Sequence, residues 1–370
     1  MIQDENGILS ARSIVCVGDR TRIALAMQKA ANGSKLTIGC IGGSITEGAG
    51  ASSWSTNYAS LTGKWWRERF TGTEICCVNA GIGATGSILG VHRVQEDLLR
   101  FKPDFVVVEY GVNDGESPAD RRCFEGLIGR ILLSENEPGV MLMFLTNKEG
   151  TNQQAWQAKI GAHYHLPMAS FRDAVWPEIG DGRIKWEDVE ADIIHPNDNG
   201  HYLVAKFITD RLAEIHAGLD AYTSLDVPNN IPEPLYGDTY RHAQILGGES
   251  IIPEAMGSWG ICRQTMVLQP GWVANGGSMP LVLQVQARNI GIVYKKYNSG
   301  DMGRAEVKVD DLPPIILDGH FPAEWGGYAC AEILAEDLRE GLHRVEITLC
   351  RDSNPESNGR EFMICGIMVS

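Results

Sequence analysis

The chain has little positive charge for its size. Its 32 lysine and arginine residues are outnumbered by 47 aspartate and glutamate residues, so the formal net charge is −15 at pH 7. Nucleic acids and anionic membrane surfaces bind clustered basic side chains, so we expect neither as a partner. No run of about 18 apolar residues occurs, so no membrane-spanning helix is expected. The N-terminal stretch MIQDENGILSAR also lacks the basic and apolar segments of a signal peptide.

The cysteines also lack the pattern of a disulfide framework or a metal site. The nine cysteines are odd in number and include no C-x-x-C motif, and several lie in apolar runs such as EICCVN and EFMICGIMVS. This distribution is typical of buried free thiols in a reducing compartment, and it favours neither a disulfide framework nor a zinc site. Together with the N-terminus, it predicts a cytoplasmic protein.

A chain of 370 residues is too long for a single hydrophobic core of ordinary size, which predicts two domains. The first, residues 1–222, alternates short apolar runs with helical periodicity. We expect strands near 36–41, 74–78, 104–111, 140–146 and 166–170, with helices near 22–30, 57–70, 88–101, 117–133, 152–164 and 198–218. This alternation predicts an α/β domain, a doubly wound parallel sheet of five strands covered by helices on both faces.

The pattern changes after a linker at 223–238, TSLDVPNNIPEPLYGD, which is rich in Pro, Asn and Asp. Residues 239–370 then show strand periodicity: Leu281, Leu283 and Val285 alternate with more polar residues, for example. Such runs, separated by turn sequences, predict an antiparallel β-sandwich. We expect Trp259 and Trp272 in its core.

The stretch LTIGCIGGSITEGAG places Ser44 directly after a predicted strand and two glycines. A phosphate loop would need a lysine where Ala49 stands. A dinucleotide fingerprint would need glycine at Ser53, and the hydrolase elbow G-x-S-x-G would need glycine at Thr46. Taken alone, this stretch leaves two interpretations of Ser44: a turn residue or a nucleophile.

A possible base for such a serine lies in DIIHPNDNGH, where Asp192 precedes His195 by three residues. Pro196 disfavours the helical conformation at His195, which predicts an extended loop. There the Asp192 carboxylate can accept the Nδ1 proton of His195 and leave Nε2 free as a base. The alternative is that both are local turn and cap residues. His201, on the following predicted helix, is expected to be structural.

Two further loops follow predicted strands: NAGIGATGS at 79–87 and GVND at 111–114. Ligands of open α/β sheets bind at the carboxyl ends of the strands, so these loops should meet the Ser44 turn at one edge. Small residues let backbone N–H groups approach a ligand, and the Asn113 amide is a neutral donor. These are the parts of an oxyanion hole, although GVND alone is more often a turn.

The four blocks GGSITEG, NAGIGATGS, GVND and DIIHP, in this order, resemble the SGNH or GDSL hydrolases over roughly residues 15–217. The resemblance implies a flavodoxin-like sheet, a triad of Ser44, His195 and Asp192, and oxyanion donors at Ser44, Ala84 and Asn113. Ala84 stands where the family usually has glycine, but the donor is a backbone N–H. Gly43 stands where aspartate is frequent. No cofactor or metal is implied.

With a C-terminal sandwich of jelly-roll type, the chain resembles bacterial carbohydrate acetylesterases that act on acetylated manno-oligosaccharides. The resemblance implies an acetylated oligosaccharide as substrate, and Trp325, in the glycine-flanked stretch HFPAEWGGY, is our candidate sugar contact. Alternatives are a lipid or acyl-thioester hydrolase on the same scaffold, or a non-catalytic sugar-binding protein. The sequence predicts neither the acetylated hydroxyl nor the oligomeric state.

Overall fold

A computed structural model describes the chain except for residues 1–3, 5–6, 223–230 and 268. The chain divides into two compact units: Met1–Gly90 with Val94–Asp238, and Val91–Arg93 with Thr239–Ser370. Half of the predicted linker, 223–230, lies outside the described residues. Its other half, 231–238, contains no helix or strand. We describe each unit by itself.

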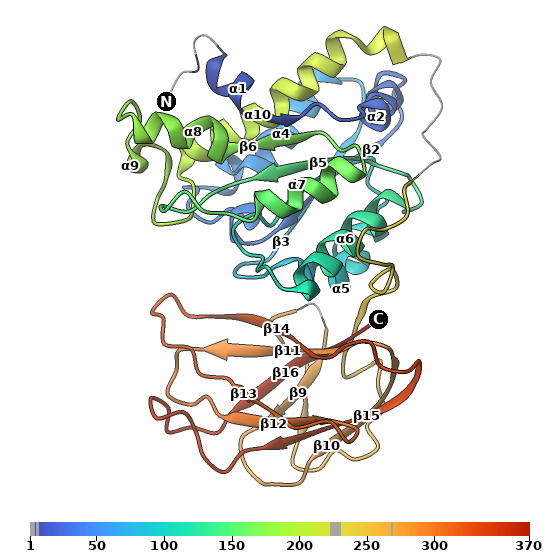
Figure 1. The fold of residues 1–370 in the computed structure, drawn as a ribbon, viewed down its shortest axis with the longest axis vertical. Helices are drawn as coiled ribbons and strands as arrows, with labels where there is room; N and C mark the ends of the chain where they lie inside the picture. Colours follow the sequence, from blue (N-terminus) through green and yellow to red (C-terminus); the bar gives the residue numbers. More distant parts are fainter. Residues whose placement is uncertain (1–3, 5–6, 223–230, 268) are drawn as a thin grey trace. The chain divides into compact units, whose positions relative to one another are not determined.

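The first unit is built on a six-stranded sheet of order β1-β6-β5-β4-β2-β3 (Figure 1). The strands are β1 (Ile14–Cys16), β2 (Leu36–Gly42), β3 (Ile75–Gly81), β4 (Phe105–Glu109), β5 (Gly139–Phe144) and β6 (Met168–Ser170). The five from β2 to β6 are parallel, as predicted. Their order is that of a flavodoxin-like sheet, and it reverses between β2 and β4, where such sheets bind ligands.

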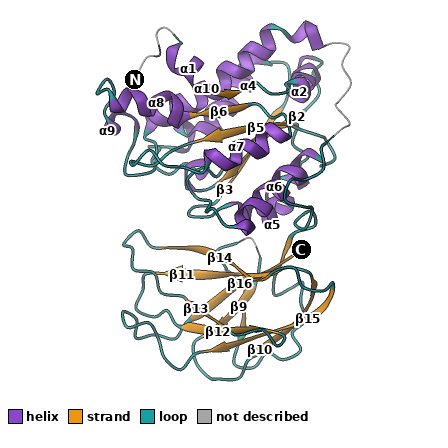
Figure 2. Cartoon of the chain, in the orientation of Figure 1, coloured by secondary structure: helices purple, strands orange, loops and turns teal. Residues whose placement is uncertain are grey.

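Helices cover both faces of this sheet (Figures 1 and 2). Helices α2, α4, α8 and α10 pack their apolar side chains on one face, while α6 and α7 contact each other on the other face. The α-helices are α1 (Ile8–Arg12), α2 (Thr21–Ala31), α3 (Ser44–Glu47), α4 (Tyr58–Arg69), α5 (Ser87–Asp97), α6 (Pro118–Leu132), α7 (Gln154–His163), α8 (Phe171–Gly180), α9 (Trp186–Val189) and α10 (Asp198–Ala217). Short 3-10 helices are η1 (Trp54–Thr56), η2 (Leu99–Phe101) and η3 (Leu219–Tyr222).

The predicted helix start at Ser117 shows how local signals set these elements. The Ser117 side chain accepts the backbone N–H of Asp120, and the Asp120 carboxylate accepts the N–H of Ser117. This capping box satisfies orphan donors of the first turn, and Pro118 has no N–H that needs a partner.

In the first unit, the described elements that were not predicted are strand β1, the helices α1, α3, α8 and α9, and the 3-10 helices η1 and η3. Strand β1 has only three residues and joins the sheet edge antiparallel to β6. Helix α8 contains Pro177, which reads in sequence as a helix breaker. The remaining helices have three to five residues, too few to show a helical period.

The second unit contains two antiparallel sheets, as predicted. One has the order β10-β15-β12-β13, the other β14-β11-β16-β9-β8, with β7 also paired to β16. The strands are β7 (Gln244–Leu246), β8 (Gly260–Cys262), β9 (Gly271–Ala274), β10 (Leu281–Ala287), β11 (Ile290–Tyr297), β12 (Arg304–Val309), β13 (Ile315–Asp318), β14 (Gly327–Ala335), β15 (Gly341–Leu349) and β16 (Phe362–Val369). Trp259 and Trp272 lie buried in the shared core, as expected.

All nine cysteines are free thiols in the structure. Of the helices in the described part of the chain, none is long and apolar enough to cross a membrane.

Candidate active site

Ser44 is the first residue of α3, at the carboxyl end of the wholly buried strand β2. Two glycines precede it because neither position has room for a side chain. A Cβ on Gly42 would lie 2.1 Å from Thr46 Oγ1, and one on Gly43 would lie 2.3 Å from Asn113 Oδ1. The Asn113 amide occupies the space beside Gly43, which accounts for glycine at a position where aspartate is frequent.

Ser44, His195 and Asp192 form a continuous chain of hydrogen bonds. The His195 Nε2 lies 2.9 Å from Ser44 Oγ, and its Nδ1 lies 2.7 Å from Asp192 Oδ2. The backbone N–H groups of Ile194 and His195 both donate to Asp192 Oδ1. Partial burial raises the pKa of Asp192, but these hydrogen bonds outweigh it and leave the pKa below its usual value. The carboxylate thus stays ionised beside the imidazole.

The loop that carries Asp192 and His195 is a narrow hairpin. Glu190 pairs with Pro196 across it, and the Ala191 N–H donates to the His195 carbonyl oxygen. The buried Trp186 indole donates to the Asp192 carbonyl oxygen at 2.5 Å. The role of Trp186 leaves no signal in the sequence, because its hydrogen-bond partner is a backbone atom.

Three donors beside Ser44 have no hydrogen-bond acceptor among the described residues: the N–H groups of Ser44 and Ala84 and the Asn113 side-chain amide. The N–H of Ser44 is free because it lies in the first turn of α3. Ala84 lies in the loop after β3 with φ 55, the left-handed region that favours glycine. A Cβ on Gly83 would lie 3.9 Å from Ser44 Cβ, so this loop reaches the nucleophile turn.

Asp114 joins the Asn113 loop to the Ala84 loop. Its Oδ1 accepts the Ser87 N–H at 2.6 Å, three residues after Ala84, and its Oδ2 accepts from Gln157 Nε2 at 2.9 Å. Burial raises the pKa of Asp114 to about 7, although the bonds from Ser87 and Gln157 oppose that rise. Neither Ser87 nor Gln157 stood out in the sequence.

His201 is buried on α10, as expected for a structural residue. Its Nδ1 accepts the Tyr58 N–H, and its Nε2 donates to the Ala49 carbonyl oxygen at 3.1 Å. Burial lowers the pKa of His201, which fits this neutral tautomer. With both nitrogens occupied, the ring holds the segment after Ser44 against α10.

Trp325, the candidate sugar contact, lies in the second unit, in the loop before β14, with 60% of its surface exposed. Its ring contacts those of Phe321 and Tyr328, with centroids 4.7 and 5.8 Å away. The loop position and the exposed face agree with the expectation from sequence, whereas sugar binding remains a prediction.

Comparison with known proteins finds one matching family and several similar solved structures. Residues 40–203 match the GDSL-like Lipase/Acylhydrolase family. None of the curated proteins compared with the chain matches it. A crystal structure of a two-domain esterase (CEX) active on acetylated mannans, co-crystallised with mannopentaose, is 29% identical in sequence, with a TM-score of 0.88 over 98% of this chain and 97% of that one.

A second crystal structure of the esterase CEX has a TM-score of 0.87 at 29% identity, over 98% of each chain. The match extends through both the α/β unit and the sandwich, beyond the range of the family match. Residues 40–203 therefore resemble the GDSL-like Lipase/Acylhydrolase family, and the whole chain is similar to a two-domain esterase. Together these likenesses identify the chain as a carboxylic ester hydrolase.

Proposed function

We propose that Ser44 is the nucleophile of an esterase that removes O-acetyl groups from carbohydrate. The observation that carries this proposal is the Ser44–His195–Asp192 hydrogen-bond chain, with distances of 2.9 and 2.7 Å. Ser44 Oγ attacks the ester carbonyl carbon while His195 Nε2 takes its proton. Asp192 holds the Nδ1 proton, fixes the tautomer and stabilises the imidazolium that forms.

The negative charge on the tetrahedral oxygen is held by the N–H groups of Ser44 and Ala84 and by the Asn113 amide. His195 then donates its proton to the leaving sugar oxygen, and the acetyl group stays on Ser44 Oγ as an ester. Water, deprotonated by His195, attacks this acyl-enzyme. His195 then returns the proton to Ser44 Oγ, and acetate leaves with the serine free again. Every proton in this sequence has a carrier among the three triad residues, so no step requires a cofactor.

We propose acetylated manno-oligosaccharides as the substrate. The support is the likeness to an esterase described as active on acetylated mannans, together with its crystal with mannopentaose. We also propose that the exposed ring of Trp325 stacks on a sugar of this substrate. A cytoplasmic location is a further proposal, supported by the nine free thiols, which persist best under reducing conditions.

The test compares wild type with Ser44→Ala by mass spectrometry of acetylated manno-oligosaccharides. Wild type should remove acetyl groups, and Ser44→Ala should lose about a thousandfold or more of kcat, because no other group attacks in the scheme. Ser34→Ala, which removes an exposed hydroxyl, serves as the matched control and should be unchanged.

A folded Ser44→Ala protein with even a tenth of wild-type turnover would contradict the nucleophile assignment. Faster release of octanoyl than acetyl groups by wild type would favour the lipid hydrolase. If wild type hydrolyses no ester and Ser44 resists a fluorophosphonate label, the protein is a non-catalytic sugar binder.

A further inference from the structure

Trp54 presents an aromatic face on the catalytic unit itself. Its side chain is 64% exposed, whereas most large aromatic side chains of this unit are buried. It lies in η1, ten residues after Ser44, in the stretch that links the nucleophile turn to α4. Neither the triad nor the oxyanion donors use it, so its exposed face is available to a ligand.

The stretch that carries Trp54 is held in place by one carboxylate. Asp198 accepts the Ser52 N–H at 2.8 Å, the Ser52 hydroxyl at 2.6 Å and the Thr56 hydroxyl at 2.7 Å. Asp198 is the first residue of α10 and follows His195 by three positions. The chain is therefore anchored on both sides of Trp54, and a ligand that binds the indole has little backbone entropy to remove.

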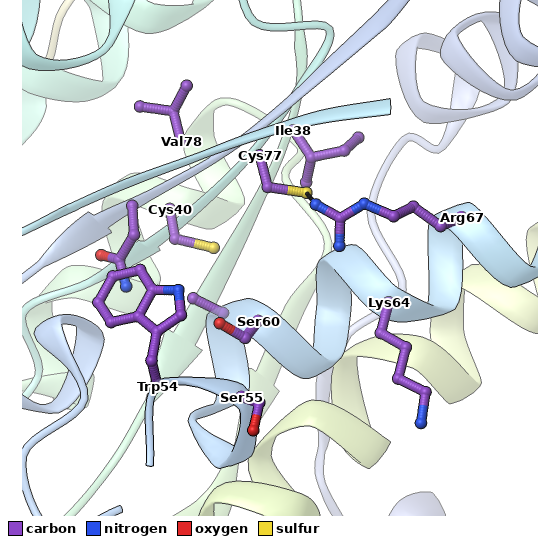
Figure 3. A pocket seen from close by; sticks show the side chains of 11 residues that line it. Ile38, Cys40, Trp54, Ser55, Ser60, Lys64, Arg67, Cys77 and Val78 are labelled. Carbon is purple, nitrogen blue, oxygen red and sulfur yellow. Dashed lines mark hydrogen bonds between the residues drawn. The ribbon is translucent and has the colours of Figure 1, made fainter. Parts of the chain in front are cut away.

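A pocket of about 370 Å³ opens beside Trp54 (Figure 3). This volume falls within the usual range for ligand sites. Figure 3 shows the Trp54 indole at one end, beside Cys40, and the side chains of Lys64 and Arg67 of α4 toward the other end. The floor comes from β2 and the edge strand β3.

The pocket shares a wall with the nucleophile turn. Asn79 lines it, and the Asn79 amide Nδ2 donates to the Thr46 carbonyl oxygen at 2.7 Å. Thr46 belongs to the same short helix as Ser44. The pocket is thus a neighbour of the ester site within one unit, and it depends on no residue of the sandwich.

The lining chemistry suits a polyhydroxylated ligand. An exposed indole can stack on the C–H face of a sugar, and Ser55, Ser60 and Asn79 offer hydrogen bonds to hydroxyl groups. Arg67 donates to the Cys77 sulfur at 2.9 Å and has no carboxylate partner among the residues the structure describes, so its other N–H groups can reach a ligand. Burial raises the pKa of Cys77, so the thiol adds no negative charge.

We propose that Trp54 and this pocket form a sugar-binding subsite for a residue of the oligosaccharide other than the one that loses its acetyl group. The proposal rests on the proposed function. It adds that the catalytic unit itself favours longer oligosaccharides over short ones. Stacking one sugar on an indole carried by an anchored segment orients the rest of the oligosaccharide at Ser44, so losing this contact costs rate as well as affinity.

The experiment measures kcat/KM of wild type and Trp54→Ala on three substrates: an acetylated manno-pentasaccharide, an acetylated monosaccharide and a small activated acetyl ester. Trp54→Ala should lower kcat/KM on the pentasaccharide by tenfold or more and stay within twofold on the other two. Trp54→Phe should recover part of the loss, because it keeps an aromatic face. Tyr202→Ala, which removes another exposed aromatic ring, is the matched control and should be unchanged.

An equal loss on all three substrates, or no loss on any, would overturn the subsite. A selective loss on octanoyl esters would also overturn it, because the pocket would then hold an acyl chain. Failure of wild type to hydrolyse any acetyl ester would instead refute the proposed function. Trp325→Ala, run in parallel, tests the sandwich proposal: it should lower pentasaccharide turnover and spare the small ester.

Discussion

At the scale of single residues, the oxyanion donors differ in what a substitution removes. Ala84 contributes only its backbone N–H and holds φ at 55, which costs an L-residue about 1 kcal/mol relative to glycine. Asn113 contributes its side-chain amide, which packs over Gly43. No other donor among the described residues can take the place of this amide if the side chain is removed. Mutation should therefore affect kcat little at Ala84 and strongly at Asn113.

Ala84→Gly should leave kcat within about threefold of wild type, because the N–H remains. The relief of backbone strain is offset by the greater freedom of glycine in the unfolded chain, so the free energy of unfolding should change by less than about 1 kcal/mol. Asn113→Ala should lower kcat by about 100-fold or more and change KM far less. Steady-state kinetics check both, and a large loss in Ala84→Gly would show that the donor in this loop is another group.

At the scale of elements, the two oxyanion loops come from different strands and need a common support. Asp114 provides it by joining the GVND loop after β4 to the N-terminus of α5 and to α7. It touches no reacting atom in the scheme and acts through its neighbours, as a positioning residue.

Asp114→Ala should lower kcat by about tenfold or more with a smaller change in KM, because a loosened donor stabilises the transition state less well. Asp114→Asn should recover most of the activity. Its amide oxygen can still accept from Ser87, and the buried Gln157 Oε1, which has no partner in the described part of the chain, can accept from the new amide after a flip. An Asp114→Ala enzyme that loses stability but keeps its kcat would limit Asp114 to a structural role.

At the scale of the whole molecule, buried acids should make stability depend on pH. Burial raises the pKa of Glu190 to about 9, helped by repulsion from Asp192. Both Glu190 carboxyl oxygens are buried and lack a hydrogen-bond partner among the residues described. In the unfolded chain a glutamate ionises near pH 4.3. Below that pH the group is protonated in both states, and its contribution to stability is fully present.

As pH rises from about 4 toward 9, the unfolded chain ionises Glu190 before the folded protein does, so the free energy of unfolding falls. Glu190→Gln removes this term. Its stability relative to wild type should increase by at least about 1 kcal/mol between pH 5 and pH 8. Hydrogen exchange of the buried β4 amides reports this for the catalytic unit. Glu187→Gln, an exposed control, should show no such trend. An unchanged difference across that range would mean that Glu190 is ionised in the folded state.

Local sequence signals predict most of the fold. The five parallel strands, the capped helix at Ser117 and the alternating strands of the sandwich each follow from periodicity or cap residues within a short window. The elements that escaped, such as β1 and α8, are too short for a period or contain a breaker. They form because an existing sheet edge or core stabilises them, and that context lies far away in sequence.

The sequence by itself determined the chemical parts of the candidate site, because each block places its residue type at a strand end that parallel topology brings to one edge. Only the tertiary structure decided how those parts meet: the 2.9 Å contact of His195 with Ser44, the amide of Asn113 against Gly43, and the link from Asp114 to Ser87. It also decided that Trp54 stands exposed while Trp66 is buried. The physical reason is that burial and hydrogen-bond partners are set by residues distant in the chain, which no local pattern records.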